Sequence, residues 1–108
     1  MQYDAMLTQL GYLPNDALLE QLDRIITNTE GFDKIGKHIL DLHDHLKVDN
    51  GHVAMSNSEE FFKIKVESDN DVIAAEAMEK IDHFAEKYKV ALRKVDGKKT
   101  FYILGFKK

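Results

Sequence analysis

Residues 88–106 read YKVALRKVDGKKTFYILGF, and this stretch carries the clearest structural signal in the chain. Two segments, 88–95 and 99–106, flank Asp96-Gly97, a pair that is typical of a tight turn between antiparallel strands. We therefore predict a β-hairpin. With a two-residue turn, four apolar side chains share one face, although a one-residue bulge beside Gly97 would shift this register. The facing pairs would be Leu92 with Phe101 and Val90 with Ile103, and the other face would carry Lys89, Arg93, Thr100 and Tyr102.

A further strand is predicted at residues 62–66, just before a helix. Apolar and charged side chains alternate there, which is the period of a strand with one buried face. The alternating residues are Phe62, Lys63, Ile64, Lys65, Val66 and Glu67. Residues 52–55 are a candidate partner strand across the polar turn 56–58. The next helix should begin near Ser68, which forms a capping-box-like pattern with Asp71, and should extend to about residue 88.

The first fifty residues predict three helices. A short helix over residues 3–10 ends at Gly11, and a second begins at Asn15, a favourable N-cap, and ends near residue 28. The third is the most regular, because its apolar residues recur at spacings of three and four and form one seam. The seam consists of Phe32, Ile35, Ile39, Leu42 and Leu46. We expect the two longer helices to pack as an antiparallel hairpin, although part of the seam could lie in a homodimer interface.

Together these elements predict an α+β fold. An N-terminal helical hairpin is followed by a β(β)αββ unit, whose small, mainly antiparallel sheet packs on one helix. A chain of 108 residues fits one domain. Within it, residues 1–50 form the helical part and residues 51–108 form an α+β part that is not expected to fold independently.

Charge is divided unevenly along the sequence. From Glu86 to Lys108 there are eight basic and two acidic residues, which gives this segment a net charge of +6. The first 85 residues carry seven basic and seventeen acidic residues, a net charge of −10, so the overall value of −4 hides a dipolar molecule. Such asymmetry bears on partners and on association rather than on the fold.

Several functional classes find no support in the composition. The chain has no cysteine, which excludes disulfides, thiolate catalysis and cysteine-bound zinc. No apolar run approaches the length of a membrane span, and the first residues lack the features of a signal peptide, so we expect a cytoplasmic protein without a membrane partner. No recognisable nucleophile motif or glycine-rich phosphate loop occurs, so we expect no catalysis and no cofactor.

The histidines of the third helix are the first candidate site. His38, Asp41 and His45 lie at i, i+3 and i+7, a spacing that could bring imidazole and carboxylate groups to one divalent ion. The same residues would lie opposite the apolar seam, where a solvated polar face is the commoner explanation, and no complete metal-ligand set is visible. His43 borders the seam and is expected to be a packed residue with one ring nitrogen hydrogen-bonded.

A basic and aromatic surface is the second candidate. Lys63 and Lys65 point away from the apolar face of their strand and could extend a row of cations on the hairpin. The proposed partner-binding residues are Lys63, Lys65, Lys89, Arg93 and Tyr102, with Phe61 and Phe106 as further aromatics. Basic sheets with aromatics can bind single-stranded nucleic acid by stacking, whereas lysines on outer strands also prevent sheet-to-sheet aggregation.

The sequence alone favours a non-catalytic protein that acts through protein–protein interaction or regulation, with an acidic protein as partner. One alternative is a binder of single-stranded nucleic acid or of a phosphorylated ligand on the sheet. A second alternative is a metal-dependent enzyme built on the histidines of the third helix. An uncovered sheet face with clustered cations would favour the first alternative, and burial of both faces would favour the interaction protein.

Overall fold

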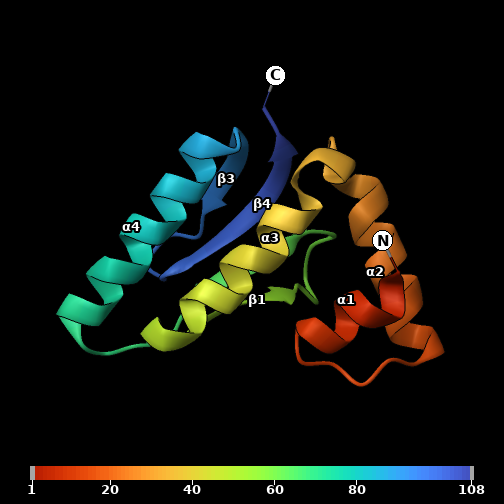
Figure 1. Ribbon diagram of the computed structural model, residues 1–108, viewed down its shortest axis with the longest axis horizontal. Helices are drawn as coiled ribbons and strands as arrows, with labels where there is room; N and C mark the ends of the chain where they lie inside the picture. Colours follow the sequence, from red (N-terminus) through yellow and green to blue (C-terminus); the bar gives the residue numbers. More distant parts are fainter. Residues whose placement is uncertain (1, 108) are drawn as a thin grey trace.

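Helices and strands follow one another in the order that the sequence predicts, which confirms the α+β class (Figure 1). The structure is a computed structural model, and it describes residues 2–107. In chain order the elements are α1 (Tyr3–Gln9), α2 (Asp16–Asn28), α3 (Phe32–Leu46), the 3₁₀ turn η1 (Lys47–Asp49), β1 (Gly51–Met55), β2 (Phe62–Val66), α4 (Asp71–Lys87), β3 (Val90–Lys94) and β4 (Thr100–Phe106). No helix within these residues is both long and apolar enough to cross a membrane.

Local sequence accounts for most helix boundaries. The side chain of Asn15 accepts a hydrogen bond from the backbone N–H of Leu18, as an N-cap does. Asn50 adopts the left-handed conformation after η1, which ends the helical segment. The predicted start of α4 is wrong by two residues, because its N-cap is Asn70, whose side chain accepts from Val72 and Ile73. Ser68 instead accepts a hydrogen bond from the N–H of Asn70, which shapes the loop before the cap.

The four strands form one antiparallel sheet in the order β1-β2-β4-β3. The predicted hairpin is present, but its register differs, with Leu92 opposite Ile103 and Val90 opposite Phe106. The cause is a longer turn, because the N–H of Val95 bonds the carbonyl of Thr100 and leaves residues 96–99 in the loop. A bulge between Ala91 and Leu92 then shifts the pairing again near the far end of the hairpin.

Only one face of the sheet is buried. Burial alternates residue by residue along β1, β2 and β4, and the helices lie on the side of the buried residues (Figure 1). Among the buried residues, Val53, Ile64 and Ile103 have no exposed surface. We call the other side the open sheet face. It includes Phe61, which directly precedes β2, and His52, Ala54, Lys63, Lys65, Arg93, Thr100, Tyr102 and Leu104. The sequence did not show whether helices cover one or both faces of the sheet, and in the structure they cover one.

The helices pack on the sheet through one continuous core. The seam of α3 is confirmed as core, because Ile35, Ile39 and Leu46 are at most 1% exposed. α3 packs on β1 and α4, whereas α2 packs on α1, so α2 and α3 meet near Gly31 and diverge from there (Figure 1). The core cluster includes residues from the four α-helices, α1 to α4, and from all four strands. The helical and the α+β parts of the chain therefore share one core.

The outer edge of β1 is closed by side chains. Nδ1 of His43 accepts a hydrogen bond from the N–H of Val53 at 3.0 Å, and the hydroxyl of Tyr12 accepts from the N–H of Met55 at 3.0 Å. His43 is 5% exposed, and burial lowers its pKa, since desolvation disfavours the charged imidazole. The prediction of a packed histidine with a bonded ring nitrogen is confirmed. With both amides occupied, this edge is protected from pairing with another strand.

The end of β4 lies against the turn between α2 and α3. Glu30 and Gly105 form an isolated parallel bridge, and the N–H of Phe106 donates to the carbonyl of Glu30 at 2.7 Å. Gly105 has a φ of 144°, and a Cβ atom there would lie 2.7 Å from the backbone nitrogen of Glu30. Only glycine fits this approach without displacing the turn.

We therefore expect Gly105→Ala to lower the free energy of unfolding by about 2–4 kcal/mol, through backbone strain and the clash with Glu30. Gly97→Ala is the matched control, because Gly97 also has a positive φ, of 74°, but no heavy atom lies within 4 Å of its added Cβ. That variant should lose only about 1 kcal/mol. Urea denaturation measures both values, and equal losses would show that the contact with Glu30 is unimportant.

Candidate functional site

The open sheet face brings four of the five predicted binding residues together. Lys63, Tyr102 and Arg93 are direct neighbours across β2, β4 and β3, and Lys65 lies in the next row opposite Thr100. Their side chains remain partly or largely exposed, since nothing in the described chain covers this face. The face therefore presents a central aromatic ring between cations from both sides.

Two residues expected at this surface lie elsewhere. Lys89 is not in a strand; it precedes β3 with a φ of 56°, and its carbonyl accepts a hydrogen bond from Lys107 at the far end of the hairpin. Phe106 packs against Gly31, and the ammonium of Lys34 lies 4.8 Å from the centre of its ring. Lys89 lies outside β3 because its positive φ interrupts the extended backbone, and Phe106 lies against the turn between α2 and α3 because the bridge of Gly105 with Glu30 holds the end of β4 there.

Arg93 joins the two aromatic rings of the open sheet face. Its guanidinium lies 5.0 Å from the ring centre of Tyr102 and 5.9 Å from that of Phe61, and these two ring centres are 6.1 Å apart. Glu59 lies 3.6 Å from the same guanidinium, a distance typical of a loose, exposed ion pair. The cation–π contacts hold the rings in place.

The hydroxyl of Tyr102 is fixed by the loop before β2. It lies 3.2 Å from Oγ of Ser58, and hydrogen bonding to Ser58 lowers the pKa of Tyr102. The sequence identified residues 56–58 as a polar turn but gave no indication that they reach β4. Only the strand order, which places β2 beside β4, brings Ser58 and Glu59 to the site.

Lys63 and Lys65 are the free cations of the surface. No acidic side chain lies within 4 Å of either ammonium in the part of the chain that the structure describes, whereas Arg93 has Glu59. The neighbouring imidazole of His52 lies 3.7 Å from Glu67, so that acid faces His52 rather than the lysines. An incoming anion could therefore bind Lys63 and Lys65 without displacing an ion pair.

The fold converts the uneven charge along the sequence into two layers. The strands and their turns, residues 51–66 and 88–107, hold eight basic and three acidic residues. The helices and their connections, residues 2–50 and 67–87, hold six basic and sixteen acidic residues. The sheet layer is therefore positive and the helical layer is negative, so that an anion is attracted to the sheet side and a cation to the helical side.

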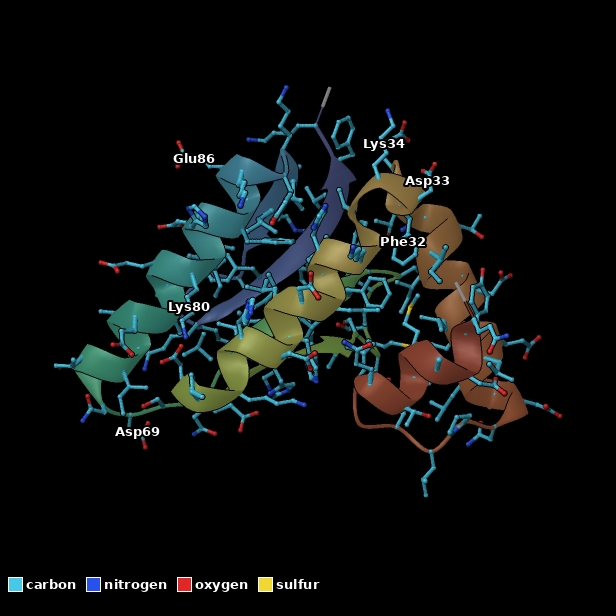
Figure 2. The ribbon with its side chains drawn as sticks, in the orientation of Figure 1. Phe32, Asp33, Lys34, Asp69, Lys80 and Glu86 are labelled. Atoms are coloured by element: carbon cyan, nitrogen blue, oxygen red, sulfur yellow. The ribbon has the colours of Figure 1, made fainter. Side chains whose placement is uncertain are left out.

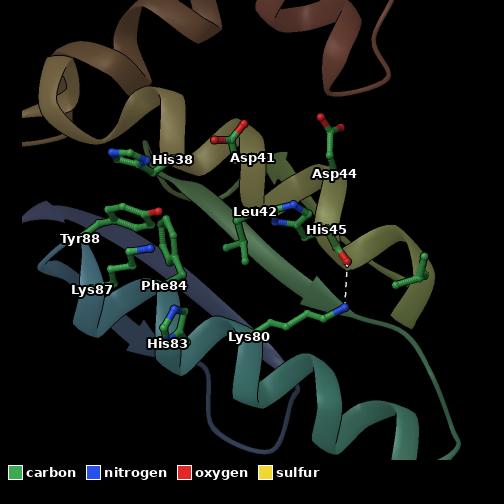
Figure 3. A pocket seen from close by; sticks show the side chains of 11 residues that line it. His38, Asp41, Leu42, Asp44, His45, Lys80, His83, Phe84, Lys87 and Tyr88 are labelled. Carbon is green, nitrogen blue, oxygen red and sulfur yellow. Dashed lines mark hydrogen bonds between the residues drawn. The ribbon is translucent and has the colours of Figure 1, made fainter.

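The predicted metal site lies in a groove between α3 and α4, on the helical side of the molecule (Figure 3). His38, Asp41 and His45 line it together with His83 from α4. The sequence predicted a solvated face for His38, and this prediction is wrong. α4 lies beside His38, whose ring stacks on Tyr88 with 3.6 Å between ring centres. Among residues 2–107, no three histidine or acidic side chains are placed to hold a metal ion together.

A buried ion pair closes one end of this groove. Asp49 is 1% exposed, and Lys80 reaches from α4 toward α3 to bond its carboxylate (Figure 2). The same ammonium donates to the carbonyl of His45 at 3.1 Å. The hydrogen bond from Lys80 is the main cause that lowers the pKa of Asp49 below its ordinary value. The pair thus links η1 and the end of α3 to α4.

The comparisons with known proteins give no information on function. No known family matches the sequence, and neither the curated proteins nor the solved structures include a match.

Lys80→Met should lower the free energy of unfolding by about 1–3 kcal/mol at pH 7, because it leaves a buried carboxylate unpaired; the half-exposed lysine keeps the loss below that of a fully buried pair. Asp49 has a lowered pKa, so its contribution is present above its unfolded value of about 3.8 and is lost as the pH falls through the folded value. The difference in the free energy of unfolding between Lys80→Met and the wild type should therefore become smaller below about pH 4.

Urea denaturation at several pH values measures this dependence. Lys87→Met is the control, since Lys87 lies in the same helix but forms no ion pair with any described residue, and it should change stability by less than about 0.5 kcal/mol. A loss in Lys80→Met that stays constant from pH 7 to pH 3 would contradict the assignment of the pair.

Proposed function

We propose that this protein is a non-catalytic binding protein that holds single-stranded nucleic acid on its open sheet face. The observation that carries the proposal is the row of Lys63, Tyr102 and Arg93 across three adjacent strands, on a face that none of the described helices covers. Stacking on aromatic rings and charge neutralisation by nearby cations are the two components of sequence-tolerant single-strand binding.

The aromatic rings favour nucleic acid over an acidic protein. Both partners would use Lys63, Lys65 and Arg93, but only unpaired bases would also gain stacking on Tyr102 and Phe61. Stacking on these rings requires bases that are free of a duplex. The arginine over Tyr102 adds a planar cation on which a base can stack.

The electrostatic field supports the same orientation. A phosphate backbone that approaches the negative helical layer is repelled, whereas the sheet layer attracts it. Lys63 and Lys65 are two residues apart on β2, so their Cα atoms are separated by roughly 7 Å along the strand. Two successive phosphates of an extended strand could contact this pair of lysines. Contact with these two lysines breaks no ion pair of the described chain, whereas Arg93 would exchange its loose, exposed pair with Glu59 for a phosphate.

Fluorescence anisotropy with labelled single-stranded DNA and RNA tests the proposal. Three engaged cations should give log affinity against log salt a slope on the order of −2, since each phosphate contact on a single strand contributes about −0.7. Tyr102→Ala should weaken binding by about 1–3 kcal/mol through lost stacking. The double variant Lys63→Gln/Lys65→Gln should weaken binding and reduce the magnitude of the slope by about 1.4.

The matched control is Lys34→Gln/Lys37→Gln, which removes the same charge from the exposed surface of α3. It should leave the affinity and the salt slope almost unchanged. Absence of binding, or an equal loss in the two double variants, would contradict the proposal. Binding of a labelled poly-glutamate peptide, without binding of any oligonucleotide, would indicate an acidic protein rather than nucleic acid as the partner.

A further inference from the structure

A second surface with the properties of a ligand site lies on the other side of the molecule. The groove between α3 and α4 has a volume of about 460 Å³, within the range of pockets that hold small organic ligands (Figure 3). Its floor is apolar and rigid, because Leu42 and Phe84 are at most 4% exposed. The groove shares no residue with the open sheet face, so it is not explained by the function proposed above.

One wall of the groove is flat and aromatic. The rings of His38 from α3 and Tyr88 after α4 are parallel within 9°, and Phe84 lies beside Tyr88 with 6.0 Å between ring centres. Aromatic surfaces of this kind bind other planar rings by offset stacking or by edge contacts. The body of the ligand should therefore be a flat aromatic ring system.

The polar groups of the groove determine the charge of the ligand. Two of them already have partners: Asp44 contacts Lys47 and Gln9, and Lys80 is bonded to Asp49. The remaining polar side chains of the groove form no hydrogen bond or ion pair with any described group. They are the carboxylate of Asp41, the ammonium of Lys87, the hydroxyl of Tyr88 and the imidazoles of His38, His45 and His83. One carboxylate thus lies among an ammonium, a hydroxyl and three imidazoles that can donate hydrogen bonds.

From this balance we infer that the groove binds a small aromatic carboxylate. The ring system would lie on Phe84 and Tyr88, and the carboxylate would accept hydrogen bonds from Lys87 and from an imidazole N–H of the groove. The helical layer is acidic as a whole, but within the groove Asp41 is the only lining carboxylate without a partner among the described residues, and Lys87 and the imidazoles make the groove locally rich in donors. A cationic ligand is disfavoured, because it would lie beside Lys87. The apolar floor favours a ligand with an apolar body over one that is polar throughout.

The test uses 2-naphthoate as the probe, titrated into the ¹⁵N-labelled protein and followed by two-dimensional NMR. The expected result is a saturable change in the amide signals of α3 and α4 around Leu42, His45 and Phe84, without comparable changes in β2 or β4. Lys87→Gln should weaken binding about tenfold, since it removes a hydrogen bond to a charged group. Lys87 is exposed, so its replacement leaves the core intact.

Two controls separate the specific site from general hydrophobic binding. The uncharged 2-naphthamide has nearly the same shape and should bind at least several-fold more weakly than the carboxylate. Lys89→Gln removes an exposed lysine two residues farther on, outside the groove, and should bind 2-naphthoate like the wild type. The inference is overturned by absence of saturable binding, by signal changes centred on the strands, by equal affinity for both compounds, or by equal affinities of the two lysine variants.

Discussion

The strict alternation of buried and exposed side chains in β1, β2 and β4 is the constraint on which the rest of the structure depends. It allows the helices to cover one face of the sheet and leaves the other face without enough apolar surface to bury. The apolar seam of α3 has its complement on the covered face, where Val53 and Ile64 are completely buried. The same alternation places Lys63, Lys65 and Tyr102 on the open sheet face.

One-sided burial also explains how charge and edges are arranged. The acidic residues gather in the helical layer, and the basic residues gather in the strands and their turns. Within the sheet, His43 and Tyr12 occupy the outer amides of β1, so this edge is closed, while Arg93 and Lys94 place charge on the β3 edge. Both edges of the sheet are therefore protected from pairing with another strand, whereas the open sheet face stays accessible.

Much of this fold could be predicted from the sequence, because periodicity and turn residues report directly on local structure. The alternation at Phe62–Val66 and the seam of α3 identified the buried faces correctly. The hairpin register could not be predicted, since Asp96-Gly97 favours a two-residue turn whereas the sheet has a longer one with a bulge. Strand alternation correctly placed Lys63, Lys65, Arg93 and Tyr102 on one face of the sheet, but it misplaced Lys89, whose positive φ puts it outside β3. Whether a face is covered, and whether α4 lies beside His38, are tertiary properties that local patterns do not contain.

Photocrosslinking tests the central claim, that the open sheet face is the surface on which the partner binds, most directly. A single-stranded oligonucleotide that contains bromodeoxyuridine would be irradiated with the full chain, and the modified peptides would be identified by mass spectrometry. The account predicts adducts on Tyr102 and Phe61, lost in high salt and absent from the helices. Adducts concentrated on α2 or α3, with Tyr102 and Phe61 unmodified, would contradict it.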